Sequence, residues 1–307
     1  MKSKFIIGID LGATNVKIGL LNSKGKILKK INLSTRNFKG RNRLLSKVIE
    51  TIRNILKENK LQTKDILGLG LGLPGPVDFK TGVIDYLPNM PGWKKFPIKK
   101  WLNLKTGLST FVDNDVNLIA LAESRMGSAR KSENMICMTL GTGVGGGIII
   151  NKNLYRGSSF AAGEVGHIPI TENGPRCNCG GRGCLECFAG NKYILRLAKK
   201  SFGRNISLER LTILAKNGNL KAIAIWRDVG RCIGIALTGV INLLNPDKIV
   251  IGGGVANAGK ILFSEIEKTV KSRAMPTHAR TVKIVKAKLA DSAGVFGAML
   301  LVKENSR

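Results

Sequence analysis

The chain has 307 residues, of which 43% are apolar and 23% charged, a composition typical of a soluble globular protein that is long enough for two domains. No apolar run reaches the roughly 18 residues of a transmembrane helix, so no membrane partner is expected. The net charge of +30 would suit nucleic-acid binding, but the basic residues are scattered and the 5% aromatic content is too low for a stacking surface, so no specific nucleic-acid partner is expected.

The N-terminal stretch MKSKFIIGIDLGATN contains a short apolar run that Asp10 interrupts, and no small-residue cleavage site follows it. It does not have the features of a secretory signal, so we predict a cytoplasmic protein. Because thiols stay reduced in that compartment, clustered cysteines favour a metal site over disulfide bonds.

The first half of the chain predicts strands that lead into α/β units. Three strands are expected first, over residues 4–10, 16–22 and 26–35. Residues 42–60 place their apolar side chains on one face of a helix. A further strand within 65–78 ends in a glycine- and proline-rich turn, and a helix is expected to begin just after Asp115 and to end at Gly127.

The same pattern then begins again. Two strands joined by a glycine-rich turn are expected over 134–155, and later elements are interrupted helices over about 190–244, strands over 248–254 and 281–289, and a last helix over 291–305. The repetition predicts two α/β domains that flank a cleft. We assign residues 1–117 to the N-terminal domain, with residues 291–307 packing back on it, and 118–290 to the C-terminal domain.

Three glycine-rich turns follow predicted strands. They are DLGATN (Asp10–Asn15), LGTGVGGG (Leu140–Gly147) and IGGGV (Ile251–Val255). Glycine lets backbone N–H groups approach an anion closely, and Thr14 and Thr142 add hydroxyl donors. Neither of the first two turns matches the P-loop or the dinucleotide-binding pattern, and one such turn alone is usually only a hairpin. Three of them together predict a nucleoside triphosphate bound between the two domains.

The stretch Gly163–Gly190 holds four of the six cysteines together with Glu164, Glu186 and one of the two histidines. Four of its residues form a Cys3His set, a common structural zinc combination: His167, Cys177, Cys179 and Cys184. The alternative is buried cysteines and a core histidine, but four ligand types at these spacings favour zinc. A metal on one ring nitrogen of His167 would fix the direction of the other nitrogen.

These motifs resemble those of the ROK family of bacterial sugar kinases and repressors. The resemblance covers nearly the whole chain and is carried, in order, by DLGATNVKIG, GLPGPVD, NMPGW, FVDNDVN, LGTGVGGG, GEVGH, CNCGGRGCLE and IVIGGGV. It implies the actin-like ATPase (ribonuclease H-like) fold and a sugar kinase that uses ATP and Mg²⁺, with zinc in a structural role.

The resemblance also implies residue roles. Asp115 is similar to the catalytic base, which accepts the proton of a sugar hydroxyl as its bond to phosphorus forms, although an Asp at a helix start can also be a plain N-cap. The positions that resemble sugar-binding residues are Gly75, Asn89, Asn114, Asp115, Glu164, His167 and Glu186. Those that resemble phosphate-binding residues are Asp10, Gly12, Thr14, Gly141, Thr142 and Gly143, and those of the adenosine turn are Gly253 and Gly254.

The resemblance favours a glucokinase, which would make glucose 6-phosphate for glycolysis, in a homodimer or homotetramer. Kinases of N-acetylmannosamine, N-acetylglucosamine, fructose or allose are alternatives. A sugar-sensing repressor is a third possibility, but repressors of the family carry a helix-turn-helix module before the first phosphate motif. Only nine residues precede Asp10 here, so we expect a kinase.

Overall fold

The computed structural model describes residues 4–87, 90 and 92–306, which form two compact units. The N-terminal unit contains the chain up to Ala122, the segment Arg156–Ala162 and the chain from Asp291 onward; the C-terminal unit contains Glu123–Tyr155 and Gly163–Ala290. The assignment of residues 1–117 and 118–290 to two separate domains stays a prediction.

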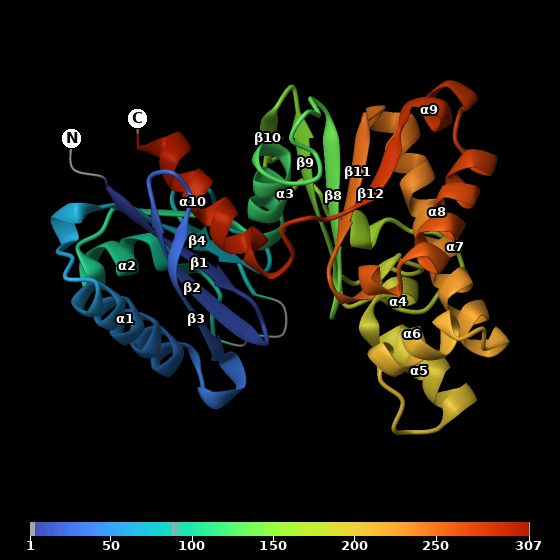
Figure 1. Ribbon diagram of the computed structural model, residues 1–307, viewed down its shortest axis with the longest axis horizontal. Helices are drawn as coiled ribbons and strands as arrows, with labels where there is room; N and C mark the ends of the chain where they lie inside the picture. Colours follow the sequence, from blue (N-terminus) through green and yellow to red (C-terminus); the bar gives the residue numbers. More distant parts are fainter. Residues whose placement is uncertain (1–3, 88–89, 91, 307) are drawn as a thin grey trace. The chain divides into compact units, whose positions relative to one another are not determined.

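A five-stranded sheet forms the centre of the N-terminal unit, with strand order β3-β2-β1-β4-β7 (Figure 1). Its strands are β1 (Phe5–Leu11), β2 (Asn15–Asn22), β3 (Ile27–Ser34), β4 (Ile66–Leu73) and β7 (Thr110–Asn114). Strands β1 to β3 pair antiparallel, whereas β4 is parallel to both β1 and β7. Beside this sheet, β5 (Val83–Ile84) and β6 (Phe96–Pro97) form a small ribbon.

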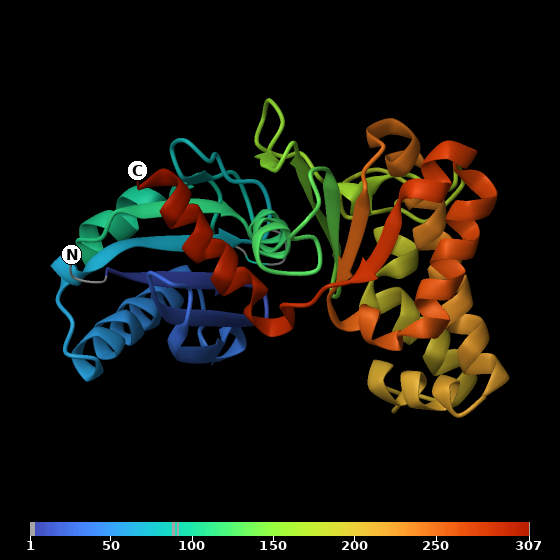
Figure 2. The same ribbon diagram turned by 45° about the horizontal axis from the view of Figure 1, so that its top comes forward.

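The two faces of this sheet are covered by different helices (Figures 1 and 2). On one face, α1 (Arg41–Glu58) and α2 (Ile98–Thr106) share a buried apolar core with alternate strand residues. On the other face, α10 (Ala293–Asn305) contacts β1 and β4. A Cβ atom at Gly70 would lie 2.0 Å from the carbonyl oxygen of Ala298, so glycine is what allows α10 to lie this close to the sheet.

The C-terminal unit repeats the strand order of the first sheet, as β10-β9-β8-β11-β12. Its strands are β8 (Met135–Leu140), β9 (Val144–Ile150), β10 (Asn153–Tyr155), β11 (Lys248–Gly252) and β12 (Lys283–Lys286). Again the first three strands pair antiparallel and the last two run parallel to the first. The predicted α/β class is confirmed, and the repetition read from the sequence corresponds to two sheets of identical topology.

Helices form most of the rest of the C-terminal unit. They are α4 (Glu186–Ala189), α5 (Asn191–Phe202), α6 (Leu208–Lys216), α7 (Leu220–Leu244), α8 (Lys260–Arg273) and α9 (Pro276–Thr281). The long α7 runs beside α8 (Figure 1), and a Cβ at Gly234 would lie 2.5 Å from Cβ of Thr269, so a small residue is needed at their contact. Among the described residues, no helix has both the length and the apolar character required to cross a bilayer.

Helix α2 and strand β7 were not predicted, and neither were the two-residue strands β5 and β6. Helix α2 has nine residues and β7 has five, and β7 ends in two polar residues, so neither shows a sustained apolar period. Helix α3 (Asp115–Arg125) begins at Asp115 itself rather than after it. The predicted catalytic base, Asp115, is therefore the first residue of α3, directly after the end of β7.

Glu123, near the end of α3, belongs to the C-terminal unit, where its fully buried carboxylate accepts hydrogen bonds from backbone N–H groups of the same unit. Its Oε2 accepts a hydrogen bond from the N–H of Ser128 at 2.7 Å, and its Oε1 accepts from Lys288 and Leu289 at 2.9 and 2.8 Å. This side chain therefore ties the end of α3 to the segment that follows β12.

We expect Glu123→Ala to lower the free energy of unfolding by about 2–5 kcal/mol, because three backbone N–H groups lose the acceptor that a fully buried carboxylate provides. The matched control is Glu133→Ala, which removes a carboxylate that is 63% exposed and paired with Lys152 on the surface, and should change stability by less than about 1 kcal/mol. Chemical denaturation of both variants measures the two effects. Equal effects would show that the buried carboxylate does not have this role.

Candidate functional site

The end of β7 places Asp115 in the first turn of α3. The Oδ1 atom of Asn114 accepts hydrogen bonds from the N–H groups of Val116 and Asn117 at 2.8 and 3.2 Å, so Asn114 is the residue that caps the helix. The Oδ1 atom of Asp115 accepts from Val116 at 2.9 Å. The plain N-cap role considered for Asp115 therefore falls to Asn114, and the helix N-terminus stabilises a negative charge at Asp115.

Asn114 also connects this turn to the loop that follows β4. Its Nδ2 atom donates to the carbonyl oxygen of Gly75 at 3.3 Å, and Gly75 has a φ of +105°, a backbone conformation that favours glycine. The structure thus brings together three of the residues predicted to bind sugar, Gly75, Asn114 and Asp115. A fourth, Asn89, lies outside the described residues.

The first predicted phosphate turn joins β1 to β2, where the N–H of Gly12 donates to the carbonyl oxygen of Asn15 at 2.9 Å and Thr14 is exposed. Asp10, at the start of this motif, faces α10, and a Cβ at Gly294 would lie 2.4 Å from its Cγ. The Nζ atom of Lys17 lies 3.6 Å from the Asp10 carboxylate. Burial raises the pKa of Asp10 although Lys17 opposes this shift.

The second predicted phosphate turn, Gly141–Gly143, joins β8 to β9 and lies against Glu186. The Oε2 atom of Glu186 accepts a hydrogen bond from the N–H of Val144 at 2.9 Å, and a Cβ at Gly143 would lie 2.5 Å from that oxygen. Sequence reasoning assigned Glu186 to sugar binding only and missed this contact. The carboxylate therefore links the cysteine-rich loop to the turn that contains Thr142.

The third turn, at Gly253–Gly254, lies against the end of β8. Gly253 has a φ of +85°, and a Cβ there would lie 2.2 Å from the carbonyl oxygen of Leu140. Leu140 immediately precedes Gly141, so the structure brings the predicted adenosine turn next to the second phosphate turn. Both turns belong to the C-terminal unit.

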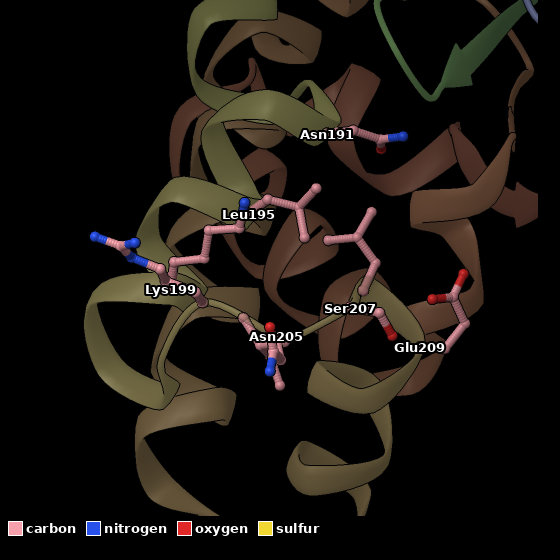
Figure 3. Close-up of a pocket in the computed structure, with 9 residues that line it drawn as sticks. Asn191, Leu195, Lys199, Asn205, Ser207 and Glu209 are labelled. Carbon is pink, nitrogen blue, oxygen red and sulfur yellow. The ribbon is translucent and has the colours of Figure 1, made fainter.

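A pocket of about 380 Å³ lies between α5 and α6 in the same unit (Figure 3). Its lining combines apolar and polar side chains: Asn191, Leu195, Lys199, Arg204, Asn205, Ile206, Ser207, Leu208 and Glu209. The backbone N–H of Asn191 donates to the carbonyl oxygen of Gly141 at 2.9 Å, so one corner of the pocket is bonded to the second phosphate turn. No motif in the sequence indicated this pocket, because two helices and a loop share its walls.

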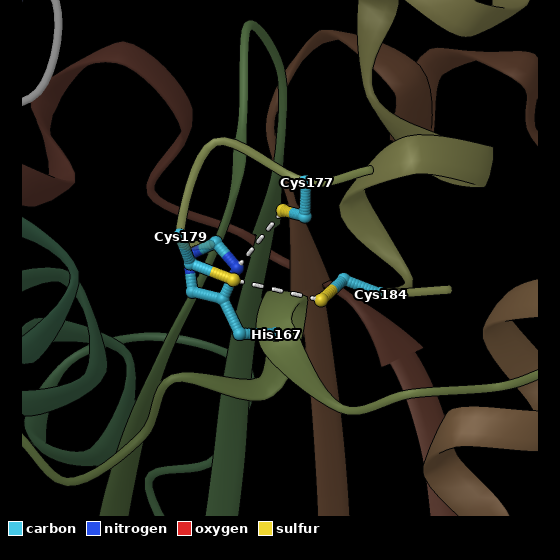
Figure 4. Close-up of side chains that lie close together, drawn as sticks. All are labelled: His167, Cys177, Cys179 and Cys184. Atoms are coloured by element: carbon cyan, nitrogen blue, oxygen red, sulfur yellow. Dashed lines mark hydrogen bonds between the residues drawn. The ribbon is translucent and has the colours of Figure 1, made fainter. Parts of the chain in front are cut away.

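The four predicted zinc ligands form one cluster (Figure 4). One ligand atom from each of them lies within 4.8 Å of all the others, with Cys179 Sγ 3.7 Å from Cys184 Sγ and Cys177 Sγ 3.5 Å from His167 Nδ1. Thiolates about 2.3 Å from a tetrahedral zinc ion lie about 3.8 Å apart, so the cluster fits that ion. All six cysteines are free thiols.

The other ring nitrogen of His167 faces away from the thiols, since its Nε2 lies 3.8 Å from Oε2 of Glu164. Burial raises the pKa of Glu164, the nearby Glu186 carboxylate adds to the rise, and His167 opposes it. Burial likewise raises the pKa of the Cys184 thiol to about 12, whereas the backbone N–H of Gly181 lowers the pKa of Cys179. The structure therefore groups Glu164, His167 and the cysteine cluster in the C-terminal unit.

Sequence reasoning missed two charged residues of the N-terminal unit, Asp113 and Arg156. The Asp113 side chain is 3% exposed, and its Oδ2 lies 2.7 Å from Nη2 of Arg156. One signal was present: an acid within an apolar strand of an acid-poor chain is unusual. Nothing in the sequence indicated its partner.

Comparisons with known proteins agree with this geometry. A glucokinase of Halalkalibacterium halodurans is 35% identical, over 99% of this chain and 96% of that protein, and a putative xylose repressor of a Caldicellulosiruptor species is 31% identical, over 97% of this chain but 77% of the repressor. Among solved structures, a ROK family glucokinase of Streptomyces griseus in complex with glucose and AMPPNP is 28% identical, with a TM-score of 0.83 over 98% of this chain and 100% of that one.

The model of the ROK family matches residues 6–305, which is nearly the whole sequence. The match to the glucokinase covers 99% of this chain and the match to the structural neighbour covers 98% of it, so both extend over the two repeated units. The chain belongs to the ROK family, and its fold is the actin-like ATPase fold of that family.

Proposed function

We propose that the protein transfers the γ-phosphoryl group of ATP to a hexose, with glucose as the favoured substrate and glucose 6-phosphate as the product. The observation that carries the proposal is the end of β7, where Asn114 caps α3 and leaves Asp115 in the first helical turn. The similarity to glucokinases, one of them solved with glucose and an ATP analogue, supports this proposal.

In the proposed reaction, a carboxylate oxygen of Asp115 accepts the proton of the sugar hydroxyl while the hydroxyl oxygen attacks the γ-phosphorus. The bond between the γ-phosphorus and the bridging oxygen breaks, and ADP leaves. Because a sugar hydroxyl is a very weak acid, the base must be held in place before the reaction begins. The Asn114 bonds to α3 and to Gly75 provide that positioning.

We infer that the nucleotide binds mainly to the C-terminal unit. The turns at Gly141–Gly143 and Gly253–Gly254 lie together, and glycine-rich turns are a common means of binding phosphates through backbone N–H groups. The pocket between α5 and α6 is bonded to the first of these turns through Asn191 and is large enough for a nucleoside.

Asp10 would hold the Mg²⁺ that accompanies ATP. The position fits a cation, because its carboxylate is largely buried and the Lys17 ammonium already lies 3.6 Å away. When bound, Mg²⁺ offsets the negative charge of the phosphates. The neighbouring glycine, Gly12, keeps the turn compact around the same place.

We propose that Glu164, His167 and Glu186 bind sugar hydroxyls and that zinc is structural. The cluster geometry supports Nδ1 of His167 as the ligand nitrogen, which leaves Nε2 on the side of Glu164. Zinc would then fix the direction of the imidazole ring and take no part in phosphoryl transfer, since all four of its positions come from protein.

A sugar-sensing regulator is the alternative function, and the similarity to a xylose repressor favours it. The chain matches 77% of that repressor's length, so a part of the repressor has no counterpart in this match. The assay below separates the two functions, because a regulator without kinase activity binds sugar and releases no ADP. Cytoplasmic location, a role in glycolysis and a homodimeric or homotetrameric assembly stay predictions.

We expect ADP release with glucose in a coupled assay that covers glucose, mannose, fructose, allose, N-acetylglucosamine and N-acetylmannosamine. Asp115→Asn keeps the size of the side chain but cannot take the proton, so it should lower kcat by about 10²-fold or more with little change in sugar affinity. ADP release with none of these sugars, or an Asp115→Asn variant with the parental kcat, would contradict the proposal.

We expect about one zinc per chain, and Cys179→Ser should lose it, because serine replaces a soft thiolate ligand. The variant should melt at a lower temperature and bind sugar more weakly, as the orientation of His167 is lost. The control is Cys187→Ser, a thiol outside the cluster of four, which should keep its zinc. Metal analysis, melting curves and sugar titration test this; a zinc-free Cys179→Ser variant with parental sugar affinity would refute the structural role.

We expect Asp10→Asn to melt at a higher temperature than the parent at pH 7, while losing activity. A carboxyl whose folded-state pKa is raised contributes stability below its unfolded pKa, about 4, and loses that contribution as pH rises through the folded-state pKa. Asparagine cannot ionise, so the gain should disappear as the pH falls below about 4.

Asp78→Asn is the control, and at pH 7 it should lower stability where Asp10→Asn raises it. Backbone N–H groups of Lys80 and Thr81 donate to Asp78, and the bond from Thr81 is the main reason why its pKa is lowered, so its stabilising contribution is present at pH 7 and lost in acid. Melting curves from acid to neutral pH compare both variants with the parent. An Asp10→Asn variant less stable than the parent at pH 7 would show that Lys17 outweighs burial.

A further inference from the structure

The carboxylate of Asp113 accepts three hydrogen bonds and forms a buried ion pair. Its Oδ1 accepts from Nδ2 of Asn117 at 2.9 Å and from the backbone N–H of Asn114 at 2.8 Å. Its Oδ2 accepts a hydrogen bond from Nε of Arg156 at 2.8 Å and forms an ion pair with Nη2 of the same guanidinium at 2.7 Å. Two of its donors, Asn114 and Asn117, lie on either side of Asp115, so this buried group determines how the chain turns at the predicted base.

Arg156 lies in a short segment of the N-terminal unit that interrupts the C-terminal unit in the sequence. Residues Arg156–Ala162 lie in the N-terminal unit, whereas the chain before and after them lies in the C-terminal unit. The segment is a closed loop, because the N–H of Ala162 donates to the carbonyl oxygen of Arg156 at 3.0 Å. Gly157, with a φ of +71°, makes the first turn of this loop.

The Arg156 side chain also stacks on an aromatic ring. Its Cζ lies 3.7 Å from the ring centroid of Phe79, and the Phe79 ring contacts the ring of Phe160 at the far end of the closed loop, with centroids 6.5 Å apart. Phe79 lies four residues after Gly75, whose carbonyl oxygen accepts from Asn114. The Arg156 guanidinium therefore contacts the two segments that position Asn114. It contacts the loop after β4 through Phe79 and the end of β7 through Asp113.

We propose that Arg156 is a positioning residue for phosphoryl transfer, acting through Asp113 to hold the Asp113–Asn117 turn in the geometry that orients the base. The inference rests on the proposed function. The Arg156 side chain bonds to Asp113 and stacks on Phe79, and its effect on the base passes through the Asp113 carboxylate. Without its partner, that carboxylate is a buried and uncompensated charge, and the turn that contains Asn114 must move to bring it to water.

If the Arg156–Asp113 ion pair only stabilised the fold, its removal would lower stability without a specific fall in kcat. Buried ion pairs are weak contributors to net stability, so a loss of stability alone would not identify the role of Arg156. Misplacing a catalytic group by about 1 Å can cost about 10²-fold in rate while ground-state binding stays intact. The distinguishing readout is therefore kcat against KM, together with restoration of the missing guanidinium.

The test uses Arg156→Ala and Arg156→Lys in the full chain, assayed well below their melting temperatures. We expect Arg156→Ala to lower kcat by about 10- to 100-fold with KM for sugar and ATP within about threefold of the parent. Millimolar guanidinium should restore part of kcat in this variant, since the free ion fits the vacated place. Arg156→Lys should retain an intermediate kcat, because it keeps the charge but not the fork and the stacking.

The matched control is Arg231→Ala, which removes another arginine–aspartate pair, with Nη2 2.7 Å from Asp228, at an exposed position on α7. It should keep the parental kcat and show no response to guanidinium. A kcat of Arg156→Ala within twofold of the parent, a KM that rises as much as kcat falls, or an absent guanidinium effect overturns the inference and leaves the proposed kinase intact. A parent protein that phosphorylates no sugar overturns both.

Discussion

The buried carboxylate of Asp113 is the constraint on which the candidate chemistry depends. An ionised group with 3% of its surface exposed is costly unless it is fully hydrogen-bonded, and here an arginine, a side-chain amide and a backbone N–H supply the donors. The donors are the backbone N–H of Asn114, the side chain of Asn117 and the guanidinium of Arg156, which lies on a distant loop. The hydrogen bonds that this carboxylate accepts from Asn114 and Asn117 therefore fix the backbone that leads into α3.

Close backbone contacts at glycines are the second constraint, and both units use them. In the N-terminal unit, Gly70 lets α10 lie against the sheet, and Gly294 lets the same helix lie against Asp10. In the C-terminal unit, Gly253 brings the third turn onto the end of β8, and Gly143 leaves room for the Glu186 carboxylate. At Gly294, Gly253 and Gly143 the glycine lies beside a residue or turn with a predicted functional role, so its small size serves the site as well as the fold.

Local patterns made part of this structure predictable. The repeated pattern of a strand, a glycine-rich turn and a second strand indicated two similar α/β repeats, and the two sheets share one strand order. The spacing of the cysteines indicated a cluster, and their ligand atoms do lie together with that of His167, while zinc itself stays a prediction. The family resemblance, rather than periodicity, supplied the roles of Asp115 and of the residues around it.

Contacts between distant residues could not be predicted from one sequence. Arg156 lies 43 residues after Asp113, and no local period relates them. The pocket beside Asn191 is formed by two helices whose sequences carry no binding motif. Helix α3 begins one residue earlier than expected because Asn114 and Asp115 are both good caps, and only the hydrogen bonds of Asn114 decide between them.

The most direct measurement of the central claim is a double-mutant cycle in kcat between Asp113→Asn and Arg156→Ala. If Arg156 acts only through the Asp113 carboxylate, removing the charge of Asp113 removes the reason why Arg156 is needed. The account predicts that the double variant loses no more activity than the more impaired single variant, a coupling of at least about 1 kcal/mol. Losses that multiply, as they do for independent sites, would contradict it.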